Sequence, residues 1–297
     1  MRVTTMMPDV QYAMQQSEET LATATQQVST SRRVNQLADD PSASASMVRS
    51  LAATANVDRY TANVSTVTAR MQTADSALSM VVTSLNQAVS LGTGGANGTL
   101  TVAQRQVVAA QVQGVLSSVM AEANTSYQGS YLFGGSATGS PPFVNTAVAG
   151  GAAAYTYVGN SSVNSVQVGD AMSVVTNLPG DQVFTSGANV VGSLQGLIAA
   201  LQTGSTTAIG AATTAVTAAL NYVGQQRVPL DNSISQLSSQ ESYLNQESVT
   251  LTTQQTALVG VDIAKAATDL SQASMVHSAV LAVAGKVLPQ TLLDYLK

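Results

Sequence analysis

The stretch VDRYTANVSTVTARMQTADSALSMVVTSLNQAVS, residues 57–90, carries the clearest periodic pattern in this sequence. Its apolar residues are separated alternately by three and four positions, and they are Val57, Tyr60, Val64, Val67, Met71, Ala74, Leu78, Val81, Leu85 and Ala88. Such spacing places the side chains along one stripe of an α-helix, as in the seam of a coiled coil. The stretch therefore predicts a long helix that packs against a partner helix along most of its length.

A second pattern of this kind lies in the C-terminal half. Apolar residues recur there at every seventh position, at Val216, Val223, Leu230, Leu237, Leu244, Leu251 and Leu258. Pro229 falls inside this run, and a proline kinks or interrupts a helix because it lacks a backbone N–H. Since the register is the same on both sides of Pro229, we expect one kinked helix rather than two unrelated helices.

The N-terminal segment predicts a helix over residues 9–34 and a break over residues 37–41. Asp40 is suited to begin the next helix, because its carboxylate accepts hydrogen bonds from the amides of the first turn. Pro41 fits the first helical position, where a missing N–H is not needed. Asp39 and Asp40 are adjacent acids, but adjacency is not the geometry of an acid–base pair. We therefore predict a structural turn at Asp39, Asp40 and Pro41.

The C-terminal segment predicts a last helix over residues 262–288, after a break at Gly260. Its three–four pattern consists of Ile263, Ala267, Leu270, Ser274, His277, Leu281, Ala284 and Leu288. The neighbouring flank is also apolar, at Val280, Val283 and Val287. A helix with two apolar flanks is expected to contact more than one partner helix.

The middle of the chain combines another helix with a glycine-rich region. A helix is predicted over residues 100–124, and Gly92, Gly94 and Gly95 are expected to end the preceding helix with a left-handed cap. Over residues 129–187 Gly and Ser are dense, and the segments 154–158 and 166–168 have the composition of strands. Helix is expected to return near Val190. We interpret the glycine-rich region as a small β insert.

These elements predict a mainly α protein, with a long antiparallel coiled-coil-like helical rod formed by the N- and C-terminal halves and a small inserted β domain. The seams alone leave parallel and antiparallel pairing open, and a chain reversal at the insert favours the antiparallel one. The expected division is into terminal helices (1–40 and 262–297), a helical rod domain (41–130 and 188–261) and the β domain (131–187). The terminal helices are expected to be labile in the monomer.

Composition argues against several functional classes. Charged residues make up only 9% of the chain. Because cysteine is absent, disulfides and thiolate chemistry are excluded. The net charge of −5, with no basic run, disfavours nucleic-acid binding. We find no run of 18 apolar residues and no apolar region at the N-terminus, so neither membrane insertion nor a cleaved Sec signal is expected.

Residues that carry catalytic chemistry are sparse. The single histidine, His277, lies in the predicted seam of the last helix and is interpreted as an interface residue. The run from Gly92 to Asn97 resembles a dinucleotide loop, but it follows a helix and Asn97 stands where the third glycine belongs. No metal site, cofactor or enzymatic activity is therefore predicted.

Four segments together resemble the flagellin superfamily, and within it the branch of hook–filament junction proteins. Residues 37–43, LADDPSA, resemble the turn that follows the family's first helix. Residues 123–143 resemble a segment specific to junction proteins, carried by Asn124, Gly129, Tyr131, Leu132, Phe133 and Gly135. Residues 262–272 and 292–296 resemble the C-terminal helix of the superfamily. Pro41 departs from the alanine typical of flagellins, which favours the junction branch.

The resemblance implies a structural component of the bacterial flagellum that joins hook to filament. Implied partners are a hook-side junction protein, flagellin, further copies of the chain in a ring or helical layer, and a cytoplasmic export chaperone that covers the C-terminal helix. Export would follow the flagellar type III route to the cell exterior, without a cleaved signal peptide. The residues expected at assembly interfaces are Tyr12, Leu21, Val28, Ile263, Leu270, His277, Leu281, Leu288, Leu292, Leu293, Tyr295 and Leu296.

Two other interpretations stay open at this point. A minor filament flagellin would share the same helical ends, but cells without it would still hold filaments. A binding module with lytic activity in the β insert would need acidic residues, and Asp170 and Asp181 are the ones that the insert offers.

Overall fold

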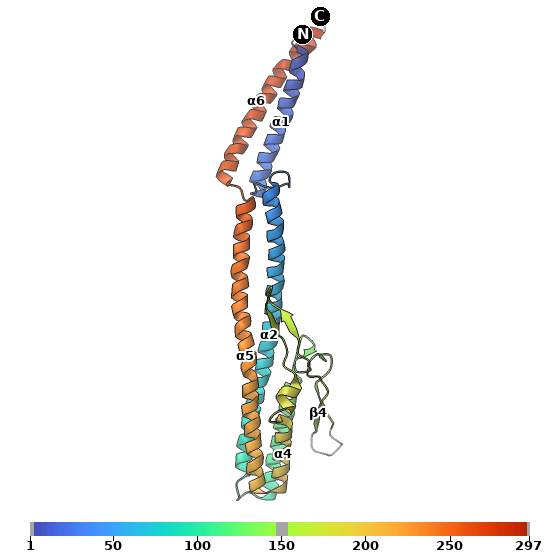
Figure 1. Cartoon of the computed structure of the whole chain (residues 1–297), viewed down its shortest axis with the longest axis vertical. Coiled ribbons are helices and arrows are strands. Elements are labelled where there is room, and N and C mark those ends of the chain that lie inside the picture. Colours follow the sequence, from blue (N-terminus) through green and yellow to red (C-terminus); the bar gives the residue numbers. More distant parts are fainter. Residues whose placement is uncertain (1–2, 147–153, 296–297) are drawn as a thin grey trace. The chain divides into compact units, whose positions relative to one another are not determined.

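The structure is a computed structural model that describes residues 3–146 and 154–295, with side chains for 8–146 and 154–286. The α-helices in the described part are α1 (Val3–Thr30), α2 (Pro41–Gly95), α3 (Val102–Ala123), α4 (Val190–Thr203), α5 (Thr206–Val259) and α6 (Ile263–Tyr295) (Figure 1). The predicted mainly α fold with a small β insert is confirmed. Contacts divide the chain into two compact units. The central unit is Val57–Asn245, and the terminal unit consists of Met1–Asn56 and Gln246–Lys297, so that both boundaries fall inside α2 and α5.

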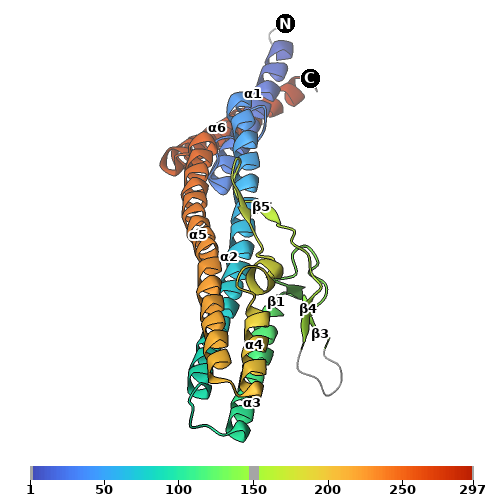
Figure 2. The ribbon, with the colours of Figure 1, turned by 60° about the horizontal axis from the view of Figure 1, so that its bottom comes forward.

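In the central unit α2 and α5 run side by side in opposite directions (Figures 1 and 2). All ten predicted seam residues from Val57 to Ala88 are at most 7% exposed. The heptad residues of α5 within this unit are buried as well, and Pro229 lies inside one continuous helix. An ion pair of 2.8 Å between Arg227 and Asp75 adds a polar contact between the two helices. The two heptad patterns therefore correspond to one antiparallel helix pair.

Short helices complete a four-helix arrangement at one end of the central unit. Here α3 packs against α4, and Leu197 and Leu201 of α4 approach the glycines near the end of α2. A Cβ on Gly92 would lie 2.4 Å from Thr213 Oγ1, and one on Gly95 would lie 2.4 Å from Leu201 Cδ2. The predicted left-handed cap is wrong, because α2 runs through to Gly95 and none of these glycines has a positive φ. They permit close packing of helices instead.

Arg105 bridges the loop after α2 and the loop after α4. It is 7% exposed, and its guanidinium donates to the carbonyl of Gly204 (2.7 Å) and to that of Asn97 (3.2 Å). Gly204 ends α4 in the left-handed conformation. The cation thereby meets the negative end of the α4 dipole and pairs with the carbonyl of the residue that ends this helix.

The β insert consists of three antiparallel two-stranded hairpins. They pair β1 (Ser126–Tyr127) with β2 (Ser130–Tyr131), β3 (Phe143–Asn145) with β4 (Tyr155–Tyr157), and β5 (Ser165–Gln167) with β6 (Ser173–Val175). A short π-helix, η1 (Asp181–Thr185), leads back to α4. Both predicted strand segments are confirmed, as β4 and β5. The segment 147–153, also assigned to the β domain, lies outside the described residues.

One segment, Asp181–Thr203, is long and apolar enough for a membrane span by length and composition alone. This finding differs from the expectation that no such stretch exists. Half of the segment is buried inside the protein, and the backbone leaves the helical conformation between η1 and α4. The buried residues of α4 include Leu194, Leu197 and Leu201. Its apolar character is therefore that of a helix in a protein core.

The terminal unit joins α1 to α2 and α5 to α6 through a compact connection at residues 31–40 and 259–262. α1 ends at Thr30, four residues earlier than predicted, because Ser31 adopts a left-handed φ of 56°. Arg33 N donates to Val259 O (2.7 Å), and Val261 N donates to Ser31 O (3.2 Å). A small apolar cluster of Val34, Ala43 and Val259, with Met47 and Leu258, lies beside these bonds.

The two acids of the predicted turn accept hydrogen bonds from different backbone amides. Asp39 Oδ2 accepts from the amides of Asn35 and Gln36, each at 2.9 Å. Asp40 Oδ1 accepts from Ala43 N (3.0 Å) at the start of α2, as predicted, and its Oδ2 pairs with Arg33 (3.2 Å). The Ala43 amide, the Ser42 hydroxyl and the Arg33 cation lower the pKa of Asp40 to about 2, and backbone amides lower the pKa of Asp39.

Two helical glycines provide a matched test of the packing of α2. Gly92→Ala is expected to lower the free energy of unfolding by about 1–3 kcal/mol, because the new Cβ must displace Thr213 Oγ1, which is itself bonded to Ile209 O. Gly114→Ala in α3 has open space at its Cβ and is expected to raise it by about 0.5–1 kcal/mol. Urea unfolding measures both. Equal effects of the two substitutions would contradict the packing role of Gly92.

The pKa of Asp40 predicts acid lability at the start of α2. Its folded-state pKa of about 2 lies below the ordinary value of 3.8, so its stabilisation is complete above that value and is lost as pH falls through the folded pKa. Protection factors of the Ser42 and Ala43 amides are expected to fall between about pH 4 and pH 2. Asp40→Asn retains an acceptor oxygen but has no proton to gain. An identical pH profile in that variant would refute the assignment.

Candidate assembly surface

The terminal unit is built on the pairing of α1 with α6. The residues of α1 that face α6 follow a three–four spacing and are Val10, Met14, Ser17, Leu21, Ala24 and Val28. The matching residues of α6 are Ala266, Leu270, Ala273, His277, Val280 and Ala284. Ser17, Ala24, Ala266, Ala273 and Ala284 are the most deeply buried of them. Small side chains at these positions let the two helices approach closely.

A polar pair lies within this seam. Ser17 Oγ donates to Met14 O (2.8 Å) and lies 3.1 Å from His277 Nδ1. A hydroxyl has one proton, so with both bonds made the Nδ1–H of His277 is the donor to Ser17. The interpretation of His277 as an interface histidine agrees with this position. A polar pair in an apolar seam favours one register of the two helices over others.

The predicted interface residues fall into three groups. Leu21, Val28, Leu270 and His277 lie half-buried in the α1–α6 seam. Tyr12, Ile263 and Leu281 are 66%, 58% and 44% exposed, so they lie outside the α1–α6 seam. The predicted pattern of α6 shares Leu270, His277 and Ala284 with the observed seam. Because both flanks of α6 are apolar, the spacing could not indicate which of them faces α1. The side chains of Leu288, Leu292, Leu293 and Tyr295, and the whole of Leu296, lie outside the described residues.

An open groove follows one side of the α1–α6 pair. One part, of about 860 Å³, has Ser17, Ala24 and Ala273 as its buried floor, with Glu19 and Asp269 among its walls. A second part, of about 260 Å³, is lined only by Val and Ala side chains, namely Val10, Ala13, Val276, Ala279, Val280 and Val283. Two paired helices with an uncovered groove have the shape that accepts a third helix.

The residues of the junction-type motif form the core of the β insert. Asn124 at the end of α3 accepts from Phe143 N (2.9 Å) and donates to Phe143 O (2.8 Å). The ring centroids of Phe133 and Phe143 lie 5.5 and 5.4 Å from that of Phe184, so the three phenylalanines of the chain form one cluster. Leu132 is buried and Tyr131 pairs with Ser126 in the first hairpin.

Glycines of this motif are needed for backbone conformation. Gly129 has a φ of 79° and follows Gln128 with a φ of 49°, the pattern of a type I′ hairpin turn between β1 and β2. Gly135 has a φ of 69°, and a Cβ there would lie 2.0 Å from Asn160 O. Tyr157 donates to Phe133 O (3.0 Å). Burial of its ring and the nearby Asp181 charge raise the pKa of Tyr157. The junction-type motif therefore determines the backbone conformation and the packing of the β insert.

The acids considered for lytic activity are each bound to a different neighbour. Asp170 Oδ1 accepts from the hydroxyl of Tyr60 (3.0 Å), and Asp181 Oδ2 accepts from Ser161 Oγ. Across residues with described side chains, no three His, Cys, Asp or Glu residues gather closely enough to hold a metal ion. The surface with the most evident binding geometry is therefore the α1–α6 groove.

Comparison with known sequences gives matches at both ends of the chain. The N-terminal helical region of bacterial flagellin matches residues 4–138, and the C-terminal helical region matches residues 213–296. Flagellar hook-associated protein 3 of Escherichia coli is 29% identical over 262 residues, which cover 80% of each chain. The Salmonella typhimurium protein of the same name is 31% identical over 162 residues, covering 54% of this chain and 49% of the relative.

Solved structures share the fold at low sequence identity. A putative flagellar hook-associated protein from Vibrio parahaemolyticus matches with a TM-score of 0.67 and 20% identity, over 74% of this chain and 99% of that one. The flagellar junction protein FlgL from Legionella pneumophila matches with a TM-score of 0.60 and 15% identity, over 72% of this chain and 100% of that one. About a quarter of this chain lies outside each of these matches.

Both flagellin regions coincide with the helices of the structure. The N-terminal match covers α1 to α3, and the C-terminal match covers most of α5 together with α6. The segments that carry the resemblance, at residues 37–43, 123–143, 262–272 and 292–296, lie within these matches or across their edges. With the two helical regions matched over most of its length, this chain belongs to the bacterial flagellin family.

Proposed function

We propose that this chain is a structural subunit of the bacterial flagellum that joins hook to filament. The observation that carries the proposal is the match to two proteins named flagellar hook-associated protein 3, one of them over 80% of both chains. A solved structure named as a flagellar junction protein shares the fold. These names favour a junction subunit over a minor filament flagellin. The proposed role is structural rather than enzymatic.

Assembly would use the groove of the α1–α6 pair. The Val and Ala walls leave apolar area in water, and covering such area contributes about 25 cal/mol per Å². A helix from a neighbouring copy is the proposed occupant. Contacts of this kind between unlike surfaces of identical copies are head-to-tail, and they generate a ring or a helical layer. Tyr12, Ile263 and Leu281 are exposed on α1 and α6 as well, outside the lining of the groove.

The proposed partners follow from a position between hook and filament. One face of the layer would contact a hook-side junction protein and the other would contact flagellin. Before assembly, an export chaperone in the cytoplasm would cover α6, because an exposed apolar helix invites premature association. Export would follow the flagellar type III route. The structure supports these proposals through the apolar surface of α6, where Met275, Val276 and Val283 are all about half exposed or more.

Complementation of cells that lack this protein tests the proposal. Such cells are expected to shed flagellin into the medium, and the wild-type chain should restore attached filaments. Ala279→Asp places a charge in the apolar part of the groove, where a docked helix could not solvate it, so attachment should fall by at least about tenfold. Ala279 is exposed in the monomer, so its fold should be unchanged.

The matched control is Ala282→Asp, an exposed alanine on the same helix that does not line the groove. It should restore filaments far better than Ala279→Asp.

A chain without residues 262–297 should neither bind the chaperone nor restore attachment. Attached filaments in cells that lack the protein would exclude the junction role and favour a minor flagellin. Equal complementation by the two alanine variants would exclude the groove as the assembly surface.

A further inference from the structure

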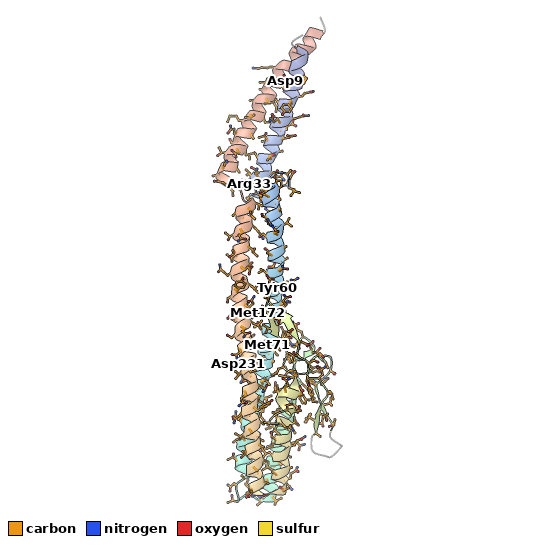
Figure 3. The ribbon with its side chains drawn as sticks, in the orientation of Figure 1. Asp9, Arg33, Tyr60, Met71, Met172 and Asp231 are labelled. Carbon is orange, nitrogen blue, oxygen red and sulfur yellow. The ribbon has the colours of Figure 1, made fainter. Side chains whose placement is uncertain are left out.

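The tip of the β5–β6 hairpin, Val168–Met172, crosses the helix pair of the central unit. From α2, Tyr60 donates to Asp170 Oδ1 (3.0 Å) and Asn63 donates to Gln167 O (2.9 Å). From α5, Gln240 Nε2 donates to Val168 O (3.0 Å). The hairpin is thus bonded to both helices, and Met172 of the hairpin lies between the levels of Tyr60 and Met71 of α2 (Figure 3).

Packing reinforces these hydrogen bonds. Val168 is fully buried although it belongs to a loop, and Gly169 is buried beside Gln240. A Cβ on Gly169 would lie 3.1 Å from Gln240 Nε2. Within the tip, Val168 N donates to Met172 O (2.9 Å), which keeps the loop closed. The tip is therefore closed by its own backbone hydrogen bond and packed onto the two helices.

The seam changes in character at the level of this contact. From Val57 onward every seam position of α2 is a buried apolar residue. Between Pro41 and Asn56, in the terminal unit, Ala43 and Ser50 are the buried residues, and Ser50 Oγ has no partner among the described atoms. Thr54 accepts from Gln255 of α5 (2.8 Å), so another layer is polar. Polar layers and small side chains stabilise a helix pair less than Val and Leu do.

We propose that this hairpin tip is a clasp that stops separation of α2 from α5 at residues 57–67 and 237–245. Helix pairs open from their weaker end, because each layer supports the next. The weaker layers here are those of residues 41–56 and 246–259. To open further, the pair must break the bonds from Tyr60, Asn63 and Gln240 and expose Val168. The clasp therefore confines opening to the terminal unit and keeps the central unit closed.

Amide hydrogen exchange of the full-length monomer tests the clasp. The triple variant Tyr60→Phe, Asn63→Ala, Gln240→Ala removes the side-chain bonds to the hairpin and leaves its backbone bonds in place. Exchange over residues 57–67 and 237–245 should become at least about tenfold faster, the change expected from losing more than one ordinary hydrogen bond. Exchange over residues 74–88 should not change. Tyr60→Phe alone removes one oxygen atom and should show a smaller increase in the same segments.

The matched control is Tyr222→Phe, which removes the bond that a tyrosine hydroxyl of α5 donates to Gln182 O (2.9 Å), away from the hairpin tip. It should leave exchange over residues 57–67 unchanged. Unaltered exchange over 57–67 and 237–245 in the triple variant, with its helix content intact, would overturn the proposal. Faster exchange over the whole central unit, including residues 74–88, would also overturn it, because the tip would then be an ordinary part of the core.

Discussion

When two helices pack along one stripe, the residues that flank this stripe stay exposed unless a further element covers them. This constraint distinguishes the two units of the chain. In the central unit further elements cover the α2–α5 pair. α3 and α4 pack at one end, and the β5–β6 hairpin lies across the other. In the terminal unit no described element covers the groove of α1 and α6. One unit is complete within the chain, and the other presents a surface that a further helix would complete.

The composition agrees with this difference. Bulky apolar residues gather in the central unit, where Leu78, Leu85, Leu197 and Leu237 are fully buried. In the terminal unit the most deeply buried residues of the α1–α6 seam are Ala and Ser, and the connection at residues 31–40 and 259–262 depends on hydrogen bonds and on the Arg33–Asp40 pair. A seam of small residues brings helices close together but buries little apolar area for each residue. The terminal unit is therefore the weaker of the two.

The sequence predicts the elements that depend on local periodicity and capping. The seam from Val57 to Ala88 and the cap at Asp40 are confirmed because spacing and side-chain chemistry determine them within a few turns. The failures involve contacts between distant segments. Gly92 is a close-packing residue because Leu197 and Thr213 approach it, and α6 buries Ala266 and Ala273 against α1 in place of the predicted Ile263 and Leu281. Neither fact can be seen in one helix alone.

We propose that α1 and α6 gain their full stability from neighbouring copies, whereas the core of α2 and α5 does not need them. Amide hydrogen exchange of the isolated chain and of assembled flagella tests this dependence on neighbours. We expect fast exchange over residues 8–30 and 263–286 in the monomer, slow exchange over 57–88, and strong protection of all these segments after assembly. Protection of the terminal helices in the monomer equal to that of residues 57–88 would contradict it.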